Sequence, residues 1–375
     1  MQPEPLPLAP VASAPSDLNP AIERALTYLH RRQLADGQFA VYCALELPMQ
    51  GWRYADSAVF PTALVAHCLL HAEKQSALAD EMLSQATEFM RNQMNHGGLW
   101  NHFTNLHHLR HLCPLDIDDT ACVSAVLRAR GVACPVPTNV PLILANRNHE
   151  GLFYSWFLLR LRWVPNRTFW RVAARELLHP VKSLLFWRGV EASRNDVDGV
   201  VNANALYYLG DIPETQPVIA FLLRIIAQKQ EGTCDLWYLD PFFVYYSFTR
   251  CYHIGITQLE PIRQPIIDRI LAQAKPDGRL GETLADTAWA VCSLLNLGSY
   301  PAELAPAVRY IQQTQGEHGE WPRWLLYYGG PKRLLGWGSE ELTTSFCLEA
   351  LVRYQQLTAP VPAEAAVCSS KLRLL

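Results

Sequence analysis

The sequence repeats one pattern along most of its length: an amphipathic segment followed by a segment that is apolar on nearly every side. An amphipathic helix covers something, whereas a helix that is apolar all round must itself be covered. The repeat therefore predicts pairs of one outer and one inner helix. Six such pairs are expected, at 21–34 with 57–72, 76–94 with 118–130, 168–190 with 198–209, 214–230 with 241–254, 261–274 with 286–297, and 302–315 with 343–354.

Six pairs that close on themselves place six inner helices within a ring of six outer helices. We therefore predict an all-α fold, a single (α/α)6 barrel over residues 21–357. An open solenoid is the alternative, but the repeat lengths suit closure and no polar capping repeat is visible. No alternating apolar and polar run predicts a strand. Residues 1–20, with six prolines, and residues 358–375 are expected to be disordered tails.

The predicted loops differ in length at the two ends of the barrel. Inner-to-outer connections are mostly short, whereas outer-to-inner connections are long. Long loops on a rigid scaffold are where binding and catalytic residues concentrate, so the long-loop end is the predicted working end. The long loops are 35–56, 95–115, 231–240 and 316–340.

Three carboxylates fall within four residues at the end of one long loop. Repulsion among Asp116, Asp118 and Asp119 should keep at least one carboxyl protonated, and a neutral carboxylic acid can donate a proton. The other interpretation is a helix cap. Asp is favoured at N-caps, and acids in a first helical turn gain about 0.3–1 kcal/mol from the helix dipole.

Two features of the sequence resemble one known family. Residues 24–39 (RAxxYLxxxQxxxGxF) and 307–321 (AxxYIxxxQxxxGxW) resemble the QW repeat of squalene-hopene and related class II terpene cyclases. Residues 116–121 (DIDDTA) match the DxDDTA motif of the same enzymes. The resemblance covers most of residues 20–357, although other copies of the repeat are degraded, with Leu280 where an aromatic residue is expected.

The resemblance implies an acid-initiated isoprenoid cyclase that needs no metal and no cofactor. Well-known members have two barrels and this chain has room for one, so it is most similar to small cyclases of prenylated aromatic, or meroterpenoid, precursors. Carried over by motif, Asp118 would protonate a terminal alkene or epoxide, and Asp116 and Asp119 would keep it protonated. The family's partner for this acid is often a His or Asn on a later inner helix. Asn202 and Asn204 are candidates, with a cap or an inter-helix hydrogen bond as the alternative role.

A carbocation formed by that protonation would need shielding from water. Aromatic faces stabilise cations by about 2 kcal/mol or more when desolvated. We expect about half of eight aromatic residues to line a cavity, the others being ordinary core: Trp52, Phe60, Tyr154, Trp156, Tyr208, Trp237, Trp289 and Trp337. Three cations near the predicted mouth could hold an anionic group or be merely solvated: Arg323, Lys332 and Arg333.

The composition of the chain limits the kinds of partner that the protein is expected to bind. A net charge of −3 gives no basic field for nucleic acid. Ten cysteines without a C-x-x-C pair indicate reduced thiols in the cytoplasm. No apolar run is long enough to span a bilayer. Residues 151–163 interleave aromatic residues with arginines, which fits either a peripheral membrane contact or substrate entrance, or a barrel helix with snorkelling arginines.

Two other functions remain open. A different α/α-barrel enzyme, such as a glycosidase, would pair two carboxylates across a cleft, for example Asp118 with Asp286. A non-catalytic helical-repeat binding module would have an open groove and a dispensable acid cluster. The clustered His107, His108 and His111 have no clean metal-ligand spacing and are interpreted as loop residues, and no zinc set of Asp, Cys and His is evident.

Overall fold

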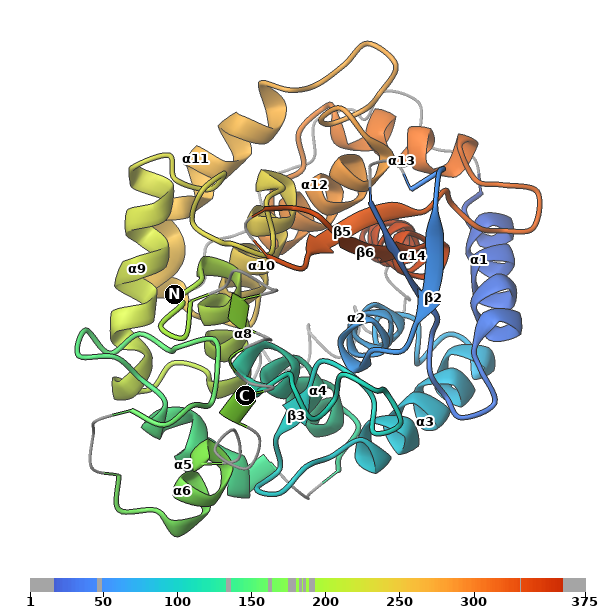
Figure 1. The fold of residues 1–375 in the computed structure, drawn as a ribbon. Coiled ribbons are helices and arrows are strands. Elements are labelled where there is room, and N and C mark those ends of the chain that lie inside the picture. The colour runs from blue at the N-terminus through green and yellow to red at the C-terminus, as the bar shows by residue number, and fades with distance from the viewer. Residues whose placement is uncertain are drawn as a thin grey trace, which may run out of the picture.

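A closed ring of inner helices forms the centre of the molecule. The computed structural model describes residues 17–359 apart from 46–48, 133–135, 161–163, 175–179, 182–183, 185–186, 189–192 and 331. Within these residues, six inner helices each pack against the next, and the last packs against the first (Figure 1). In ring order they are α2 (Val59–Leu69), α4 (Ile117–Ala129), α8 (Gly199–Leu209), α10 (Pro241–His253), α12 (Leu284–Asn296) and α14 (Glu340–Thr358).

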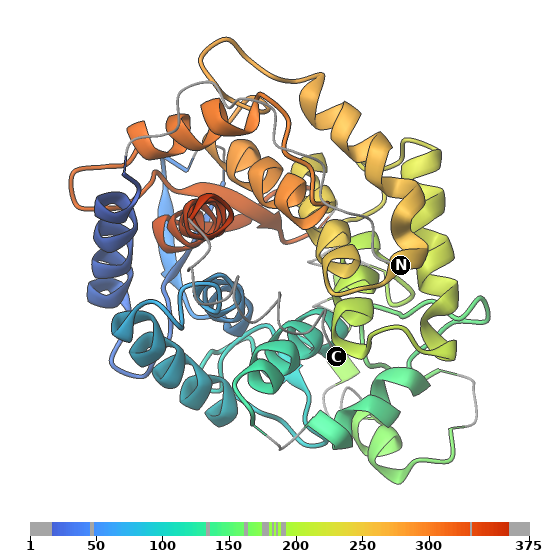
Figure 2. The same ribbon diagram turned by 180° about the vertical axis from the view of Figure 1, so that it is seen from behind.

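Amphipathic helices surround this ring, as Figure 2 shows from behind. Each buries one face and exposes the other, and the all-α barrel predicted from the sequence is confirmed. Five outer helices lie where the pattern predicted them: α1 (Asn19–Arg32), α3 (Ala77–Asn92), α9 (Gln216–Ala227), α11 (Glu260–Leu271) and α13 (Leu304–Gln313).

The remaining outer position is more complex than the repeat suggested. Two short helices, α5 (Val136–Ala145) and α6 (Arg167–Ala173), pack against each other beside α4. Eleven of the 23 residues of the helix expected at 168–190 lie outside the described residues, as do residues 1–16 and 360–375 of the predicted tails. Among the described helices, none is both long and apolar enough to cross a bilayer.

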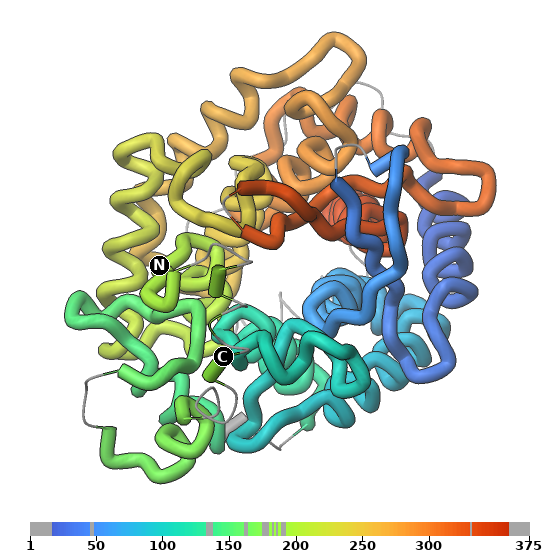
Figure 3. The backbone as a smooth tube through the Cα atoms, in the orientation of Figure 1, coloured from blue at the N-terminus to red at the C-terminus, as the bar shows by residue number. Residues whose placement is uncertain are grey.

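The expectation of no strands was wrong. Two hairpins form a four-stranded antiparallel sheet in the order β2-β1-β6-β5. Figure 3 shows the blue N-terminal hairpin beside the red C-terminal one at one end of the barrel. A further pair, β3 (Trp100–Asn101) with β4 (Leu115–Asp116), precedes α4. The sheet strands are β1 (Val41–Ala44), β2 (Arg53–Asp56), β5 (Trp324–Tyr328) and β6 (Gly336–Ser339).

There is a physical reason why the sequence pattern did not predict these strands. They are at most five residues long, and every residue of β6 is buried, so no alternation of apolar and polar residues marks it. Gly338 lets β6 approach its neighbour, because a Cβ there would lie 1.9 Å from the carbonyl oxygen of Trp324.

The QW-like repeats tie neighbouring outer helices together. Gln315 donates to the carbonyl oxygens of Gly319, at 3.0 Å, and Ala21 of α1, at 2.9 Å. The Trp321 indole N–H donates to the carbonyl oxygen of Ile311 in α13, at 2.8 Å. The equivalent glutamine of the repeat at 24–39 makes the same two contacts. Gln33 donates to the carbonyl oxygens of Gly37 and of Met82 in α3. The repeats therefore fasten adjacent helix pairs to each other.

Gly319, which follows α13, lies in close contact with the backbone of α1. It has a φ of +98°, and a Cβ there would lie 2.3 Å from the carbonyl oxygen of Arg24. We expect Gly319→Ala to lower the free energy of unfolding by about 3 kcal/mol, because left-handed backbone costs about 1–2 kcal/mol and overpacking adds about 1–3. Gly298→Ala is the matched control, with a φ of +59° and nothing within 4 Å. Equal losses for both variants in urea denaturation would contradict the proposed crowding.

Candidate active site

The acid motif lies where β4 turns into α4, at the end of the barrel that carries the sheet. Asp116 caps the helix, since its Oδ1 accepts from the backbone N–H of Asp119 at 2.7 Å. Strand β3 and the backbone of Ser155 and Trp156 hold this turn from both sides. The cap interpretation is therefore right for Asp116, and the cap directs Asp118 away from the backbone into a cavity.

Two of the three carboxyl groups, those of Asp116 and Asp119, are buried. Burial raises the pKa of Asp116 well above its ordinary value, and the neighbouring Asp119 adds to this shift. Burial likewise raises the pKa of Asp119 to about 7. Asp118 is partly accessible from the cavity that it lines, and burial raises its pKa too. The cluster can therefore hold protons at a pH where an ordinary Asp is ionised.

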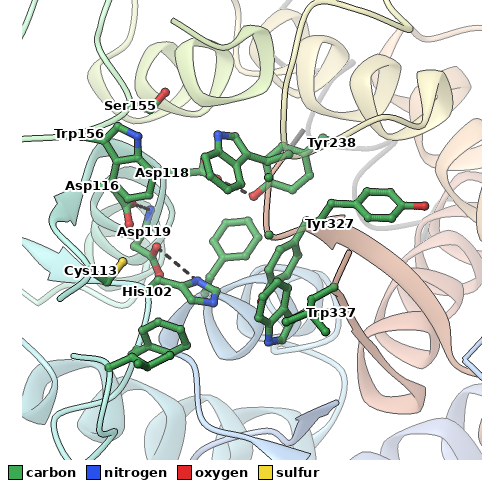
Figure 4. A pocket seen from close by; sticks show the side chains of 18 of the residues that line it. His102, Cys113, Asp116, Asp118, Asp119, Ser155, Trp156, Tyr238, Tyr327 and Trp337 are labelled. Atoms are coloured by element: carbon green, nitrogen blue, oxygen red, sulfur yellow. Dashed lines mark hydrogen bonds and ion pairs between the residues drawn. The ribbon is translucent and has the colours of Figure 1, made fainter. Parts of the chain in front are cut away.

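Asp118 has a hydrogen-bond donor at each carboxyl oxygen. Asn204 Nδ2 lies 2.6 Å from Oδ1. The Tyr238 hydroxyl lies 2.5 Å from Oδ2, and Figure 4 marks this second hydrogen bond with a dashed line. Both donors lower the pKa of Asp118 against the larger effect of burial. They would stabilise the carboxylate left after proton release, and a hydroxyl can rotate to accept when the acid is protonated. This arrangement suits a proton donor that must be both protonated and strong.

Arg250 of α10 orients the Asn204 amide. Its Nη2 donates to Asn204 Oδ1 at 2.5 Å, so the amide must present its NH2 group to Asp118. Arg250 is only 4% exposed, and its guanidinium lies over the rings of Tyr207, at 5.1 Å, and Tyr246, at 4.9 Å. Its charge also lowers the pKa of Asp118. Sequence reasoning missed Arg250, although a lone arginine in an apolar inner helix was a signal.

The cavity in front of Asp118 has a volume of about 470 Å³ and mostly apolar walls. In Figure 4 the three acids lie on one side, with Tyr327 and Trp337 on the other. Four of the eight predicted aromatic residues line it: Phe60, Trp156, Trp237 and Trp337. Further lining residues outside those eight include Tyr54, His102, Phe103, Tyr238 and Tyr327.

The other four aromatic residues do not line this cavity. Trp52 is exposed beside Tyr54, and Tyr154 stacks under Arg160, whose guanidinium lies 3.7 Å from its ring centroid. The Tyr208 hydroxyl donates to Asn139 at 2.8 Å, which turns its ring toward the outer layer. Trp289 packs in the barrel core, and its neighbours there are Phe243 and Phe346.

Asn202 lies apart from the acid, unlike Asn204. Its side chain accepts from the backbone N–H of Phe153 at 2.9 Å and donates to the Phe153 carbonyl at 3.0 Å. It therefore fastens the preceding loop to α8, which is the structural alternative considered for it. In the described part of the 151–163 segment, Phe153 and Phe157 are buried, and Arg160 donates to Asn146 at 3.1 Å; residues 161–163 lie outside the description.

Asp286 does not share the cavity with Asp118. It forms a capping box with Thr283 at the start of α12, and its Oδ1 accepts from the Thr283 hydroxyl at 2.6 Å. The carboxylate pair required by the glycosidase alternative does not face one cleft. The clustered histidines behave as loop residues: His107 stacks on Phe103 and lies 2.9 Å from Asp56.

Within the described residues, one group of side chains has metal-ligand spacing: His67 and His71 of α2 with Glu349 of α14, whose ligand atoms lie within 4.8 Å of one another. Glu349 Oε1 already accepts from Arg353 at 2.8 Å. Burial, and then the charge of Arg250, lowers the pKa of His67. A metal ion would meet two fixed guanidinium charges here, so we assign this cluster a structural role.

Scans of the sequence against protein-family models and against curated proteins gave no match. Solved structures do match. Type II terpene cyclase MstE from Scytonema has a TM-score of 0.65 at 17% identity, over 91% of this chain and 99% of that one. This barrel has the type II terpene cyclase fold. A protein from Actinoplanes matches with a TM-score of 0.62 at 20% identity, over 90% of this chain and 99% of that one.

The terpene cyclase fold does not by itself decide the chemistry. A possible member of the GH105 family from Salmonella enterica also matches, with a TM-score of 0.50 at 12% identity, over 96% of this chain and 97% of that one. MstE has been solved in complex with geranylgeranyl dihydroxybenzoate as substrate and with merosterolic acid A as product. Any function for the present chain must be argued from its own site.

Proposed function

We propose that this protein is a class II isoprenoid cyclase that starts its reaction with Asp118 as the acid. The observation that carries the proposal is the position of Asp118. It is flanked by two buried carboxyl groups, receives one hydrogen bond at each oxygen, and faces an apolar aromatic cavity. A binding module has no need for such an acid, and a glycosidase would need a second carboxylate across the cleft.

In the proposed reaction Asp118 gives its proton to a terminal alkene or epoxide. The carbon cation that results is attacked by the next double bond of the chain, so each new ring carbon–carbon bond uses one π bond. Loss of a proton to a base at the end leaves a product that is an isomer of the substrate. Phe60, Trp237 and Tyr327 line the cavity, where their aromatic rings would stabilise the cation. The proposed chemistry uses no metal.

The proposed substrate is a polyprenyl or prenylated aromatic compound. The mostly apolar cavity wall supports a hydrocarbon chain, and the likeness to MstE, solved with a prenylated dihydroxybenzoate, supports an aromatic head. The buried cysteines Cys43, Cys251 and Cys347 are free thiols, which supports a location in the reducing cytoplasm. The cation pair Lys332 and Arg333 lies at the rim of the cavity, whereas Arg323 is paired with Glu340 away from it.

Product formation by the purified protein in EDTA tests the proposal. The panel is farnesyl and geranylgeranyl diphosphates, squalene, and geranylgeranylated hydroxybenzoates in alkene and epoxide forms. We expect a cyclic product of unchanged mass from at least one of them. Turnover of a carbohydrate panel instead, or activity that depends on added metal, would contradict the proposal.

Tyr238→Phe should move the pH dependence of that activity. Asp118 must be protonated to act, so activity is lost as the pH rises through its pKa. Since Tyr238 lowers the pKa of Asp118, removing its hydroxyl should raise that pKa and shift the loss to higher pH. The maximal rate should fall about tenfold to a hundredfold, because the carboxylate product loses a donor.

Tyr327→Phe is the matched control for Tyr238→Phe. It removes a hydroxyl from the same wall, and that hydroxyl has no hydrogen-bond partner. The alkaline limb of its pH–rate profile should coincide with that of the wild type. An alkaline limb that moves equally in both variants, or in neither, would remove Tyr238 as a partner of the acid.

A further inference from the structure

His102 lies beside the acid cluster in the wall of the cavity. It directly follows β3, whose pairing with β4 sets Trp100 opposite Asp116. The carbonyl oxygen of His102 accepts from the backbone N–H of Val59 at 2.8 Å, so the residue is fixed between the start of α2 and the turn into α4. His102 Nδ1 lies 3.9 Å from Asp119 Oδ2, and Figure 4 marks this contact with a dashed line.

Three aromatic rings of the cavity wall contact the His102 imidazole edge to face. The ring centroids of Phe103, Tyr327 and Trp337 lie 4.9, 5.5 and 6.0 Å from that of His102. Burial in this wall lowers the pKa of His102 to about 4, so the imidazole is uncharged at neutral pH. An uncharged imidazole is the form that accepts a proton.

The two ring nitrogens of His102 have different surroundings. A neutral imidazole carries one N–H donor and one acceptor nitrogen. The carboxyl group of Asp119 beside Nδ1 favours the tautomer with the proton on Nδ1, which leaves the lone pair on Nε2. In Figure 4 the ring extends from Asp119 toward Tyr327 and Trp337 across the cavity. Nε2 is therefore an acceptor that faces the cavity.

Other polar groups among the described residues of the cavity wall are less suited to accept a proton. The lysine and arginine side chains there are cations, and the indoles only donate. Once Asp118 has donated its proton, hydrogen bonds from Asn204 and Tyr238 stabilise its carboxylate and weaken it as a base. The Ser155 hydroxyl donates to Asp198 at 2.5 Å, and an alcohol oxygen is a weaker base than an imidazole.

We propose that His102, backed by Asp119, is the base that ends the reaction; this names the base of the proposed cyclisation and rests on that function. His102 Nε2 takes a proton from a carbon next to the final cation. The C–H bond breaks, its electron pair becomes the new C=C bond, and an N–H bond forms at Nε2.

Asp119 completes the step. Attraction between the imidazolium and the Asp119 carboxylate draws the two groups together, and Nδ1 passes its proton to Oδ2. The direction of this transfer follows from the pKa of Asp119, about 7, which lies above that of His102. Since Asp118 gave up one proton at the start, the site holds as many protons at the end as it did before the reaction.

His102→Phe tests the proposal, because phenylalanine keeps an aromatic ring in the wall and removes both nitrogens. The rate of substrate consumption and the composition of the products are measured with the substrate identified from the panel. Consumption should fall less than about tenfold, because the general acid Asp118 still starts the reaction. The share of the wild-type alkene among the products should fall about tenfold or more. Isomeric alkenes, and an alcohol formed by addition of water to the cation, should take its place.

His108→Phe is the matched control, since His108 lies on the same loop and does not line the cavity. Its products should equal those of the wild type. His102→Gln should change the products as His102→Phe does, which covers the case in which phenylalanine disturbs the wall.

Two outcomes would overturn the role of His102 alone. In the first, the wild type cyclises its substrate and both His102 variants give the wild-type products. In the second, Ser155→Ala changes the products and the His102 variants do not, so that Ser155 would be the base. A wild type that cyclises none of the panel would instead overturn the proposed function, and the base with it.

Discussion

Asp118→Asn should reduce product formation about a thousandfold or more. General acids contribute about 10²–10⁴-fold, and an alkene is so weak a base that loss of the positioned acid should cost the upper part of that range. The amide keeps the shape of the carboxyl group and can still meet Asn204 and Tyr238, so the loss would report the missing proton. The measurement is the initial rate with the substrate identified from the panel.

Asp286→Asn is the control for Asp118→Asn. It neutralises a buried carboxylate at the start of another inner helix, but one that caps its own helix and does not line the cavity. Its rate per folded molecule should stay near that of the wild type. If Asp118→Asn instead kept a substantial part of the wild-type rate, Asp118 would not be the donor and the proposed mechanism would fail.

Glu349→Gln should lower the free energy of unfolding by about 3–5 kcal/mol. Glu349 is fully buried, and its two oxygens accept from Arg353 and from the Tyr246 hydroxyl, each at 2.8 Å. Burial lowers the pKa of His71 to about 4, so His71 is uncharged at neutral pH and Arg353 is the counter-charge. Removing one partner of a buried ion pair leaves the other charge uncompensated, which accounts for the size of the loss. Urea denaturation measures it.

A double variant and a pH series test the predicted role of Glu349 further. Glu349→Leu with Arg353→Met removes both charges, and it should cost less than Glu349→Gln alone. Burial alone would raise the pKa of Glu349, but its charged neighbours hold it below the ordinary value. Its contribution is therefore present above about pH 4.5 and lost as the pH falls below it. Equal stability of Glu349→Gln and the wild type at neutral pH would contradict the buried pair.

The helices and the acid motif could be predicted from the sequence because both depend on a local pattern. An inner helix must be apolar all round, and the three carboxylates are adjacent in the chain. The partners of Asp118 are a different matter. Asn204 is 86 residues away and Tyr238 is 120 residues away, so only the closed barrel brings them together. Asn202 and Asn204 look alike in the sequence. Because they are two residues apart on a helix, their side chains point in different directions.

The aromatic residues show the same limit. An apolar inner helix gives no signal of which face meets the cavity, so Trp289 and Tyr208 were as good candidates as Phe60. Trp237 and Trp337 come from segments predicted as long loops at the sheet-bearing end, and that predicted position was the better guide, although Trp337 lies in β6. The sheet itself went unpredicted because its strands are short and its pairing joins residues 41–44 to residues 336–339.

The pairing of β1 with β6 has a consequence for how the protein is made. As the chain leaves the ribosome, β1 and α2 emerge long before their neighbours β6 and α14. Until then β1 has an open edge and α2 an apolar face with nothing to cover it, which are the features that invite aggregation. The acid motif is likewise synthesised long before Tyr327 and Trp337, which complete its cavity. The nascent chain must therefore be shielded until β6 and α14 have been made, and the active site can form only after them.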